Sequence, residues 1–179
     1  MANSAFRALA ELALSSRETA QGLPAQETSA PRWSGVGFSL LGERFVSSMG
    51  HVSELLEVPD STRMPGVQPW VIGLSNVRGR LLPLFDLSAF LGGTMVTSRK
   101  SQRVLVLETE ALYSGIVVES SFGMQHFNSE QFNEKIYGLP ETVGGFIDGA
   151  YKDITGETWP VFSLAKLAED TKFINAALV

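Results

Sequence analysis

The chain has 179 residues, of which 44% are hydrophobic and 18% are charged, and its formal net charge is −5 at pH 7. This length fits one domain or two small lobes that share a core, and the composition is ordinary for a globular protein. The absence of cysteine excludes disulfides, thiol catalysis and thiolate metal sites, and the acidic balance argues against nucleic acid as a partner. No apolar run reaches the length of about 18 residues that spans a bilayer, so we expect a cytoplasmic protein without direct membrane insertion.

Residues 1–32 are expected to form an N-terminal helical extension and a linker. Phe6, Leu9 and Ala13 recur at helical spacing. Small and polar residues interrupted by prolines follow them, which is typical of a linker. The folded body is therefore predicted to begin near Trp33.

The residues after Trp33 are typical of short strands separated by turns. Runs at 33–41 and 44–49 flank a turn at Gly42, and a further extended segment follows at 51–57. Repeated prolines then interrupt the chain before the next apolar segment.

The most informative stretch predicts a β-hairpin followed by a short helix. Two β-compatible runs at 72–75 and 81–85 flank the segment 76–79, Asn-Val-Arg-Gly, in which Asn tolerates positive φ and Gly adopts it without steric cost. Asp86 stands one place before an apolar helical turn that ends at Gly92, so it is predicted to cap that turn. A cationic tip on an apolar hairpin indicates a contact surface and not a catalytic cleft.

The second half repeats this order of strand, hairpin, strand and apolar helical turn. The expected segments are strands at 103–108 and 113–119, a stretch at 121–131 that leads into a polar loop ending near Pro140, strands at 143–151 and 157–162, a helix capped by Ser163, and a tail at 169–179. Many short strands with glycine turns predict a mainly all-β fold built from small barrels or a sandwich. We expect a domain at 33–168 with two barrel-like lobes, at about 33–92 and 101–168, between which the chain crosses.

Motifs of phosphate-binding loops, dinucleotide-binding folds, serine hydrolases and zinc proteases are not found in the sequence. His51 and His126 are the only histidines, and each is better explained as a surface or packed side chain than as a metal ligand. Glu54 and Asp86 are conceivable as an acid and a base, but no nucleophile accompanies them. We therefore expect no enzymatic activity, no cofactor and no metal.

Several separated motifs agree in order and spacing with one known family. They are Val52-Ser53-Glu54, Thr62-Arg63-Met64-Pro65, the run Gly-Leu-Ser-Asn-Val-Arg-Gly at 73–79, the run Leu-Pro-Leu-Phe-Asp-Leu at 82–87, and Gly-Ile-Val-Val-Glu at 115–119. On these residues the chain resembles the CheW family, the coupling proteins of bacterial chemotaxis arrays, from about Trp33 to Ala168. Two positions depart from the family pattern, because Glu119 stands where Asp is usual and Ser163 where Asp or Asn is common.

A narrower resemblance is to the CheW-like proteins of chemosensory systems that govern type IV pili and twitching motility. It rests on local segments at 22–26, 33–38 and 122–127, which read Gly-Leu-Pro-Ala-Gln, Trp-Ser-Gly-Val-Gly-Phe and Phe-Gly-Met-Gln-His-Phe. The alternative within the family is a coupling protein of general flagellar chemotaxis. A remote alternative is a small-barrel nucleic-acid-binding protein, although the basic cluster at 99–103 contains no aromatic residue.

The family resemblance implies a non-catalytic signalling adaptor made of two intertwined SH3-like five-stranded β-barrels with short helices. It implies one surface for the regulatory domain of a CheA-like histidine kinase. A second surface, in the groove between the barrels, would hold the cytoplasmic hairpin tip of a methyl-accepting chemoreceptor. In the pilus systems these partners are ChpA-like and PilJ-like, and the adaptor is recruited to receptor arrays at the inner membrane.

The resemblance also assigns residues to these two surfaces. The receptor-binding residues it implies are Val52, Glu54, Asn76, Arg78, Met124 and Gly145, and the kinase-binding residues are Gly73 and Leu74. Glu54 would hold the Arg78 guanidinium in one orientation while leaving donors free for a partner. The competing interpretation is an exposed ion pair that stabilises the fold by less than about 1 kcal/mol.

Structural explanations compete with a binding role at several of the other positions. Asn76 is equally explained by turn chemistry, and Val52 and Met124 by core packing. Gly73 is explained as a backbone requirement, although a side chain there would enlarge the base of the hairpin and block the kinase surface. Asp86 is assigned to capping and not to binding.

Overall fold

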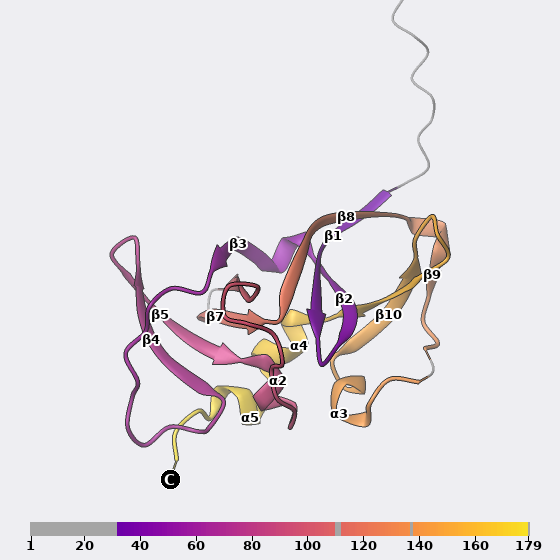
Figure 1. The fold of residues 1–179 in the computed structure, drawn as a ribbon. Coiled ribbons are helices and arrows are strands. Elements are labelled where there is room, and N and C mark those ends of the chain that lie inside the picture. Colours follow the sequence, from indigo (N-terminus) through magenta and orange to yellow (C-terminus); the bar gives the residue numbers. More distant parts are fainter. Residues whose placement is uncertain (1–31, 110–111, 137, 179) are drawn as a thin grey trace, which may run out of the picture. The chain divides into compact units, whose positions relative to one another are not determined.

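The computed structural model describes residues 32–109, 112–136 and 138–178, which form a mainly β structure with short helices (Figure 1). The elements in chain order are β1 (Arg32–Leu40), β2 (Glu43–Ser48), the 3-10 helix η1 (Met49–His51), β3 (Val52–Glu57), β4 (Val71–Val77), β5 (Arg80–Asp86), α2 (Leu87–Phe90), β6 (Arg103–Glu108), β7 (Tyr113–Val118), β8 (Ser120–Asn128), the 3-10 helix η2 (Ser129–Gln131), β9 (Phe132–Asn133), α3 (Glu141–Gly144), β10 (Ile147–Lys152), β11 (Thr158–Phe162), α4 (Leu164–Glu169) and α5 (Thr171–Ile174). The expected N-terminal helix and linker lie outside the described residues, apart from Arg32, at which β1 begins.

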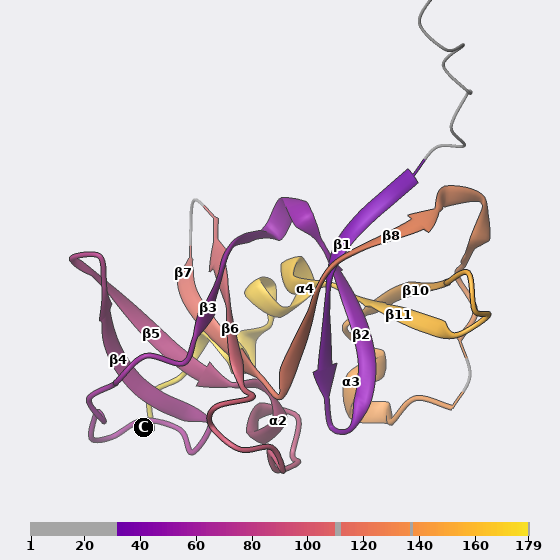
Figure 2. The same ribbon diagram turned by 45° about the horizontal axis from the view of Figure 1, so that its top comes forward.

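The strands form two mixed sheets, which confirms the mainly all-β prediction and fits two SH3-like barrels (Figures 1 and 2). One sheet has six strands in the order β8-β1-β2-β11-β10-β9, and the other has five in the order β3-β6-β7-β5-β4. Most neighbours are antiparallel, but β11 is parallel to β2 and β5 is parallel to β7. The six-stranded sheet exceeds the expected five because the two-residue strand β9 pairs with β10.

The chain passes from one sheet to the other and back. It leaves the six-stranded sheet after β2, builds the five-stranded sheet from β3 to β7, and returns at β8. Strands of both sheets therefore occur in each of the two expected lobes, 33–92 and 101–168. The cause is that β1 pairs on one side with β2 and on the other with the distant strand β8, along nearly its whole length.

Three apolar clusters form the core, one within each barrel and one between the two sheets. Strand β6 shows the division, because Val104 and Val106 lie in the cluster of the five-stranded barrel while Leu105 and Leu107 lie in the cluster between the sheets. Alternate side chains of a strand point to opposite faces. Burial of both faces explains why this strand appears in the sequence as an uninterrupted apolar run.

The segment after β3 closes the five-stranded barrel by pairing with its far edge strand, β4. The Thr62 N–H donates to the Leu74 carbonyl at 2.8 Å, and the Leu74 N–H donates to the Thr62 carbonyl at 2.9 Å. The Ser75 hydroxyl also donates to the Asp60 carbonyl at 2.5 Å. These bonds satisfy backbone groups that the edge of an open sheet would leave unpaired.

Two of the expected segments differ from the structure. The stretch at 121–131, expected only to lead into a polar loop, is mostly strand β8, whose regular alternation is broken by Gly123 at φ +70° and by a register shift against β1. The predicted strand at 143–151 begins instead with helix α3, and the strand β10 starts only at Ile147. A short apolar stretch does not distinguish one helical turn from the start of a strand.

The two predicted helix caps have different outcomes. The Asp86 carboxylate accepts the Ala89 N–H at 2.9 Å and caps α2 as predicted. Burial raises the pKa of Asp86, and the hydrogen bonds that its carboxylate accepts only partly offset this rise. Ser163 precedes α4, but its hydroxyl makes no capping bond. Its backbone N–H donates to Phe146 at 2.7 Å, which ties this buried residue to the segment after α3 instead.

Candidate protein-binding surface

The tip of the β4–β5 hairpin is a two-residue turn at Arg78 and Gly79, with φ values of +52° and +82°. Two positive φ values in succession are typical of the turn that best matches the twist of a hairpin. Asn76 was expected to be the residue that tolerates positive φ, but it remains in β4 and its side-chain oxygen accepts the Gly79 N–H at 2.9 Å. Turn chemistry therefore accounts for Asn76, and Arg78 itself adopts the left-handed conformation.

Arg78 and Glu54 form the ion pair that the family resemblance implies. The Arg78 Nη2 atom lies 2.5 Å from Glu54 Oε1, and the Nη1 atom lies 3.2 Å from Oε2. Glu54 belongs to β3, so this bidentate pair links the hairpin tip to the opposite edge strand of the barrel. The Arg78 side chain is 76% exposed and that of Glu54 is 29% exposed, so the guanidinium is the part available to a partner.

A second arginine lies beside this pair and was missed at the level of sequence. Arg80 Nη1 lies 3.0 Å from Glu108 Oε1, and the Arg80 guanidinium carbon lies 3.8 Å from the centre of the Tyr113 ring. Glu108 and Tyr113 face each other across the β6–β7 ladder. The facing positions of Glu108 and Tyr113 could be predicted from the sequence, because β6 and β7 are consecutive antiparallel strands. Their closeness to Arg80 could not, because it depends on the parallel pairing of β5 with β7, which no local motif indicates.

Both arginines line one shallow pocket of about 210 Å³ at this end of the five-stranded barrel. The residues around it are Ser53, Glu54, Val77, Arg78, Arg80, Val106, Glu108 and Tyr113. We call these eight residues the barrel-end surface. It contains no histidine and no nucleophile placed next to a base, so its chemistry is that of ion pairing and hydrogen bonding.

The two expected kinase-binding residues lie at the base of the same hairpin. Gly73 has φ +149°, and a Cβ atom built there would lie 2.3 Å from the carbonyl oxygen of Thr62. The backbone at 62–63 therefore covers this face of Gly73, which supports the interpretation of Gly73 as a backbone requirement. Leu74 is partly exposed and makes the backbone pairing with Thr62.

The remaining expected receptor residues lie elsewhere. Val52 is partly buried against the cluster between the sheets, as core packing would require. Met124 lies on β8 and is 55% exposed, so packing does not explain it. Gly145 is exposed at the end of α3, which lies on the opposite side of the described body from the β4–β5 turn (Figures 1 and 2). The structure thus joins Glu54 and Arg78, with Asn76 in the adjoining turn, and places Met124 and Gly145 with the other sheet.

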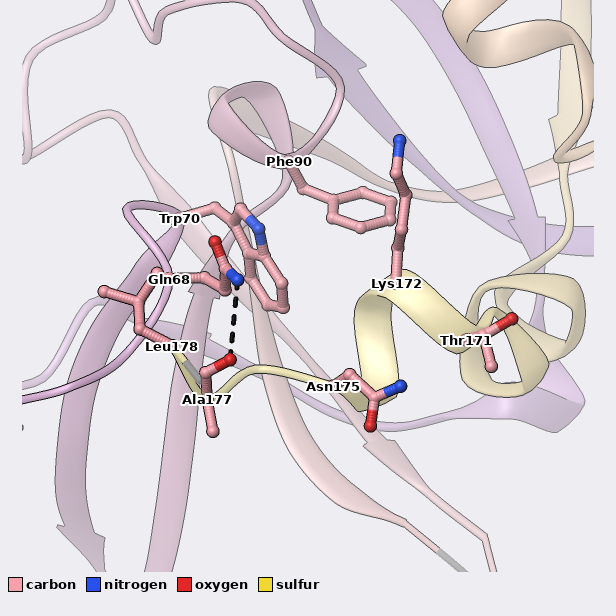
Figure 3. Close-up of a pocket in the computed structure, with 8 residues that line it drawn as sticks. All are labelled: Gln68, Trp70, Phe90, Thr171, Lys172, Asn175, Ala177 and Leu178. Carbon is pink, nitrogen blue, oxygen red and sulfur yellow. Dashed lines mark hydrogen bonds between the residues drawn. The ribbon is translucent and has the colours of Figure 1, made fainter.

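A cavity of about 800 Å³ lies between α5, the C-terminal segment and two aromatic side chains, Trp70 and Phe90 (Figure 3). The Gln68 side-chain amide donates to the Ala177 carbonyl across it at 3.4 Å. Lys172 is the only titratable side chain among the described residues that line this cavity, so the cavity offers no acid–base pair.

Within the described parts of the chain, no three His, Asp or Glu side chains gather into a group suited to a metal ion, and no helix is long and apolar enough to cross a membrane.

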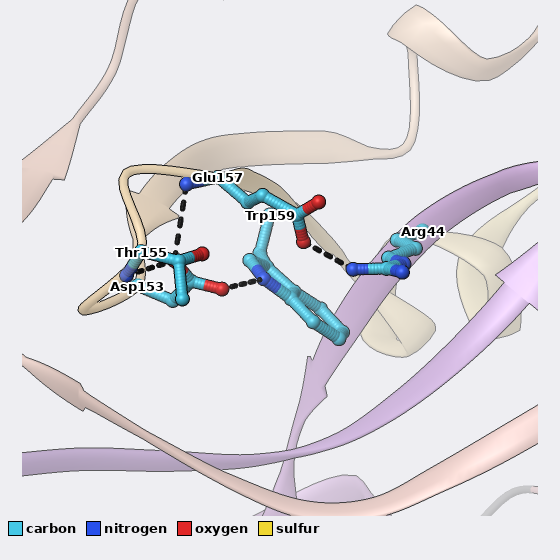
Figure 4. Close-up of polar contacts among 5 residues, drawn as sticks. All are labelled: Arg44, Asp153, Thr155, Glu157 and Trp159. Atoms are coloured by element: carbon cyan, nitrogen blue, oxygen red, sulfur yellow. Dashed lines mark hydrogen bonds and ion pairs between the residues drawn. The ribbon is translucent and has the colours of Figure 1, made fainter.

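A polar cluster at the end of the β10–β11 hairpin holds the six-stranded sheet together at its surface (Figure 4). The Asp153 carboxylate accepts the Thr155 hydroxyl at 2.6 Å, the Thr155 N–H at 2.8 Å and the Trp159 indole N–H at 3.0 Å. Arg44 pairs with Glu157, and its guanidinium carbon lies 5.5 Å and 5.7 Å from the ring centres of Phe122 and Trp159. The hydrogen bond from the Thr155 hydroxyl, with those from Trp159 and the backbone, lowers the pKa of Asp153 below its ordinary value.

Asp153→Asn is expected to lower the Tm at neutral pH and to reduce its fall in acid. Because the pKa of Asp153 is lower in the folded state than in the unfolded one, the ionised carboxylate stabilises the fold above the ordinary pKa of 3.8. That stabilisation is lost as the pH falls through the lowered value. Thermal melts from neutral pH to about pH 2 would show the Tm difference between wild type and Asp153→Asn shrinking with acid. Thr155→Val removes a hydrogen bond that lowers the pKa of Asp153, so the fall in Tm should move to higher pH. A Tm difference between wild type and Asp153→Asn that stays constant across the pH range would contradict this account.

Comparison with known proteins defines the class to which this fold and surface belong. The model of the CheW-like domain family matches residues 34–172, and the chain belongs to this family. Among curated relatives, Protein PilI of Pseudomonas aeruginosa is 42% identical over 173 residues, which cover 97% of this chain and 96% of that protein. Chemotaxis protein CheW of Thermotoga maritima is 25% identical over 128 residues, or 66% of this chain and 83% of that protein.

The fold agrees with a solved structure of the same family. The crystal structure of the scaffolding protein TtCheW from Thermoanaerobacter tengcongensis superposes with a TM-score of 0.64 and 20% sequence identity. The match covers 74% of this chain and 90% of that one. The resemblance to CheW proteins drawn from separated motifs is thereby confirmed, as is the similarity to the CheW-like protein of a type IV pilus system.

Proposed function

We propose that this chain is a non-catalytic adaptor that couples methyl-accepting chemoreceptors to a CheA-like histidine kinase and so controls type IV pilus twitching motility. Family membership and the 42% identity to PilI along nearly the whole chain support this proposal. Its partners would be a ChpA-like kinase and a PilJ-like receptor. The protein would reside in the cytoplasm and be recruited to receptor arrays at the inner membrane.

The observation that carries the proposal is the Arg78–Glu54 pair at the hairpin tip. An exposed pair of this kind contributes little to stability, so a role in binding explains its bidentate geometry better than stability does. A guanidinium has five donors, so Arg78 keeps several for a partner while Glu54 fixes its orientation. Fixing the side chain in advance reduces the entropy lost on binding.

Two surfaces serve the two partners in this proposal. The receptor surface would comprise Glu54, Asn76 and Arg78 at the barrel end, with Val52 in the same strand as Glu54. Met124 and Gly145 would add separate receptor contacts beside the other sheet. The kinase surface comprises Gly73 and Leu74 at the base of the hairpin. Both surfaces use the β4–β5 hairpin, so receptor and kinase would be held by one rigid element and the receptor conformation would bias kinase activity.

A coupling protein of flagellar chemotaxis is the second candidate. The matches to the CheW proteins of Thermotoga maritima and Bacillus subtilis favour it, the latter at 25% identity over 84 residues. Both cover less of this chain than the match to PilI does, and at lower identity. Swarming and twitching assays of a deletion strain would separate the two, because loss of twitching alone is expected.

Arg78→Glu is expected to weaken binding to the cytoplasmic fragment of a PilJ-like receptor by at least about tenfold while leaving the fold intact. The reversed charge would repel Glu54 and remove the guanidinium donors that Arg78 offers to the partner. A substitution at an exposed turn residue nevertheless costs little stability. Isothermal titration would measure the affinity, and a thermal melt would check the fold.

Arg44→Glu is the matched control, because it reverses an exposed, carboxylate-paired arginine of the other sheet. It should leave receptor affinity unchanged. Unchanged affinity in Arg78→Glu would remove Arg78 from the receptor surface. Absence of binding by the wild-type protein to both receptor and kinase fragments would overturn the adaptor proposal as a whole.

A further inference from the structure

We propose that Arg80, oriented by Glu108 and Tyr113, is a second anchor of the receptor surface, and that together with Arg78 it recognises acidic side chains of the partner. This inference rests on the proposed function and adds to it the chemistry by which the protein recognises its receptor. It concerns three residues to which neither the family motifs nor the sequence assigned a role.

The first observation is that both arginines of the barrel-end surface are held in place. Arg78 is fixed by the two oxygens of Glu54, whereas Arg80 is fixed by one oxygen of Glu108 and by the face of the Tyr113 ring at 3.8 Å. Stacking on an aromatic ring leaves the edge of a guanidinium free to donate hydrogen bonds. Arg80 Nη1 faces Glu108, and the other donors of Arg80 form no hydrogen bond with the described residues.

The second observation concerns what the surface shows to solvent. The Arg80 side chain is 56% exposed against 43% for Glu108, and the difference is larger between Arg78 and Glu54. In both pairs the guanidinium group is the more exposed member, although the four charges sum to zero. A partner therefore has more access to the guanidinium groups than to their carboxylates, and carboxylates are the groups that complement them.

The third observation is that the two arginines border one hollow. The pocket of about 210 Å³ lies between β3, the hairpin and the start of β7, with Val77 and Val106 among its lining residues. A hollow of this size accepts a side chain and not a small-molecule cofactor, for which pockets of about 300 Å³ or more are usual. A mostly polar hollow bordered by two cationic groups suits an Asp or Glu side chain projecting from a helical hairpin.

The test measures the affinity and salt dependence of receptor binding by single variants at this surface. Arg80→Ala is expected to weaken binding of the PilJ-like cytoplasmic fragment by about tenfold and to reduce the dependence of the association rate on NaCl concentration. Tyr113→Leu keeps the charge but removes the stacking, so it should weaken binding by a smaller factor while preserving the salt dependence. Tyr113→Phe keeps the ring and should bind as the wild-type protein does.

Arg44→Ala is the control, because Arg44 is also paired with a carboxylate and lies over aromatic rings, but in the other sheet. It removes the same charge and should leave receptor affinity unchanged. Neutralising the acidic residues of the receptor fragment by Glu→Gln and Asp→Asn substitution should lower wild-type affinity and abolish the difference between wild type and Arg80→Ala.

The outcomes separate this inference from the adaptor function. If the wild-type protein binds the receptor and Arg78→Glu does not, but Arg80→Ala binds normally, the second anchor is refuted and the adaptor function stands. If Arg80→Ala and Arg44→Ala weaken binding equally, the effect is one of net charge and the anchor is likewise refuted. If the wild-type protein binds no receptor fragment, both proposals fail.

Discussion

Leu105→Asp is expected to abolish cooperative folding of the whole described body, and not of one lobe alone. Leu105 is fully buried in the cluster between the two sheets, where residues from both lobes pack together. A carboxylate at this position would have neither a cationic partner nor a hydrogen-bond donor supplied for it. The expected cost is more than about 4 kcal/mol, which approaches the whole stability of an ordinary domain.

Circular dichroism and thermal melting would measure this loss, with Leu81→Asp as the control. Leu81 lies on β5 and is 65% exposed, so the same substitution there adds a charge in contact with water. We expect Leu81→Asp to melt within a few degrees of the wild type. A soluble Leu105→Asp variant with a sharp melting transition would contradict the core assignment.

Gly73→Ala is expected to destabilise the protein and to weaken kinase binding together. The new Cβ atom would lie 2.3 Å from the Thr62 carbonyl oxygen, a backbone atom that moves only if the barrel closure at Thr62 and Leu74 opens. The positive φ of 149° adds backbone strain. We expect a loss of about 2–4 kcal/mol of unfolding free energy, measured by denaturant titration.

Gly79→Ala is the control that distinguishes backbone strain from the steric clash with Thr62. Gly79 also has a positive φ, but a Cβ atom there would meet nothing within 4 Å. Its expected cost is about 1 kcal/mol, and kinase affinity should stay unchanged. If Gly73→Ala melts as the wild type does and still loses the kinase, then Gly73 contacts the kinase directly and is not a backbone requirement.

Local patterns in the sequence predict much of the five-stranded barrel and its hairpin. The apolar runs of β6 and β7, the turn before Arg80 and the Asp86 cap all depend on residues close to one another in the chain. Such features are set by side-chain alternation, turn chemistry and capping, which act over a few residues. Family motifs then add the Glu54–Arg78 pair, which local patterns alone do not place.

The features that escaped prediction depend on contacts between distant segments. Strand β8 was not predicted, because its polar residues and Gly123 conceal the alternation and only pairing with β1 makes it a strand. The position of Arg80 over Tyr113 likewise follows from the parallel pairing of β5 with β7. Parallel and long-range pairings leave no local pattern in the sequence. The order of the strands along the chain therefore does not show which sheet each strand joins.

The return of the chain to its first sheet has a consequence for synthesis on the ribosome. The five-stranded barrel has all its strands once Val118 has emerged, whereas the β1–β2 hairpin waits for β8 and β11, which end at Asn128 and Phe162. Until then the apolar side chains of Phe38 and Phe45 lack the partners that bury them. Contacts between residues so far apart in sequence form slowly, and exposed apolar strands are prone to aggregate. Strands β1 and β2 are therefore made before the five-stranded barrel but completed after it, and the nascent chain stays vulnerable until Phe162 has emerged.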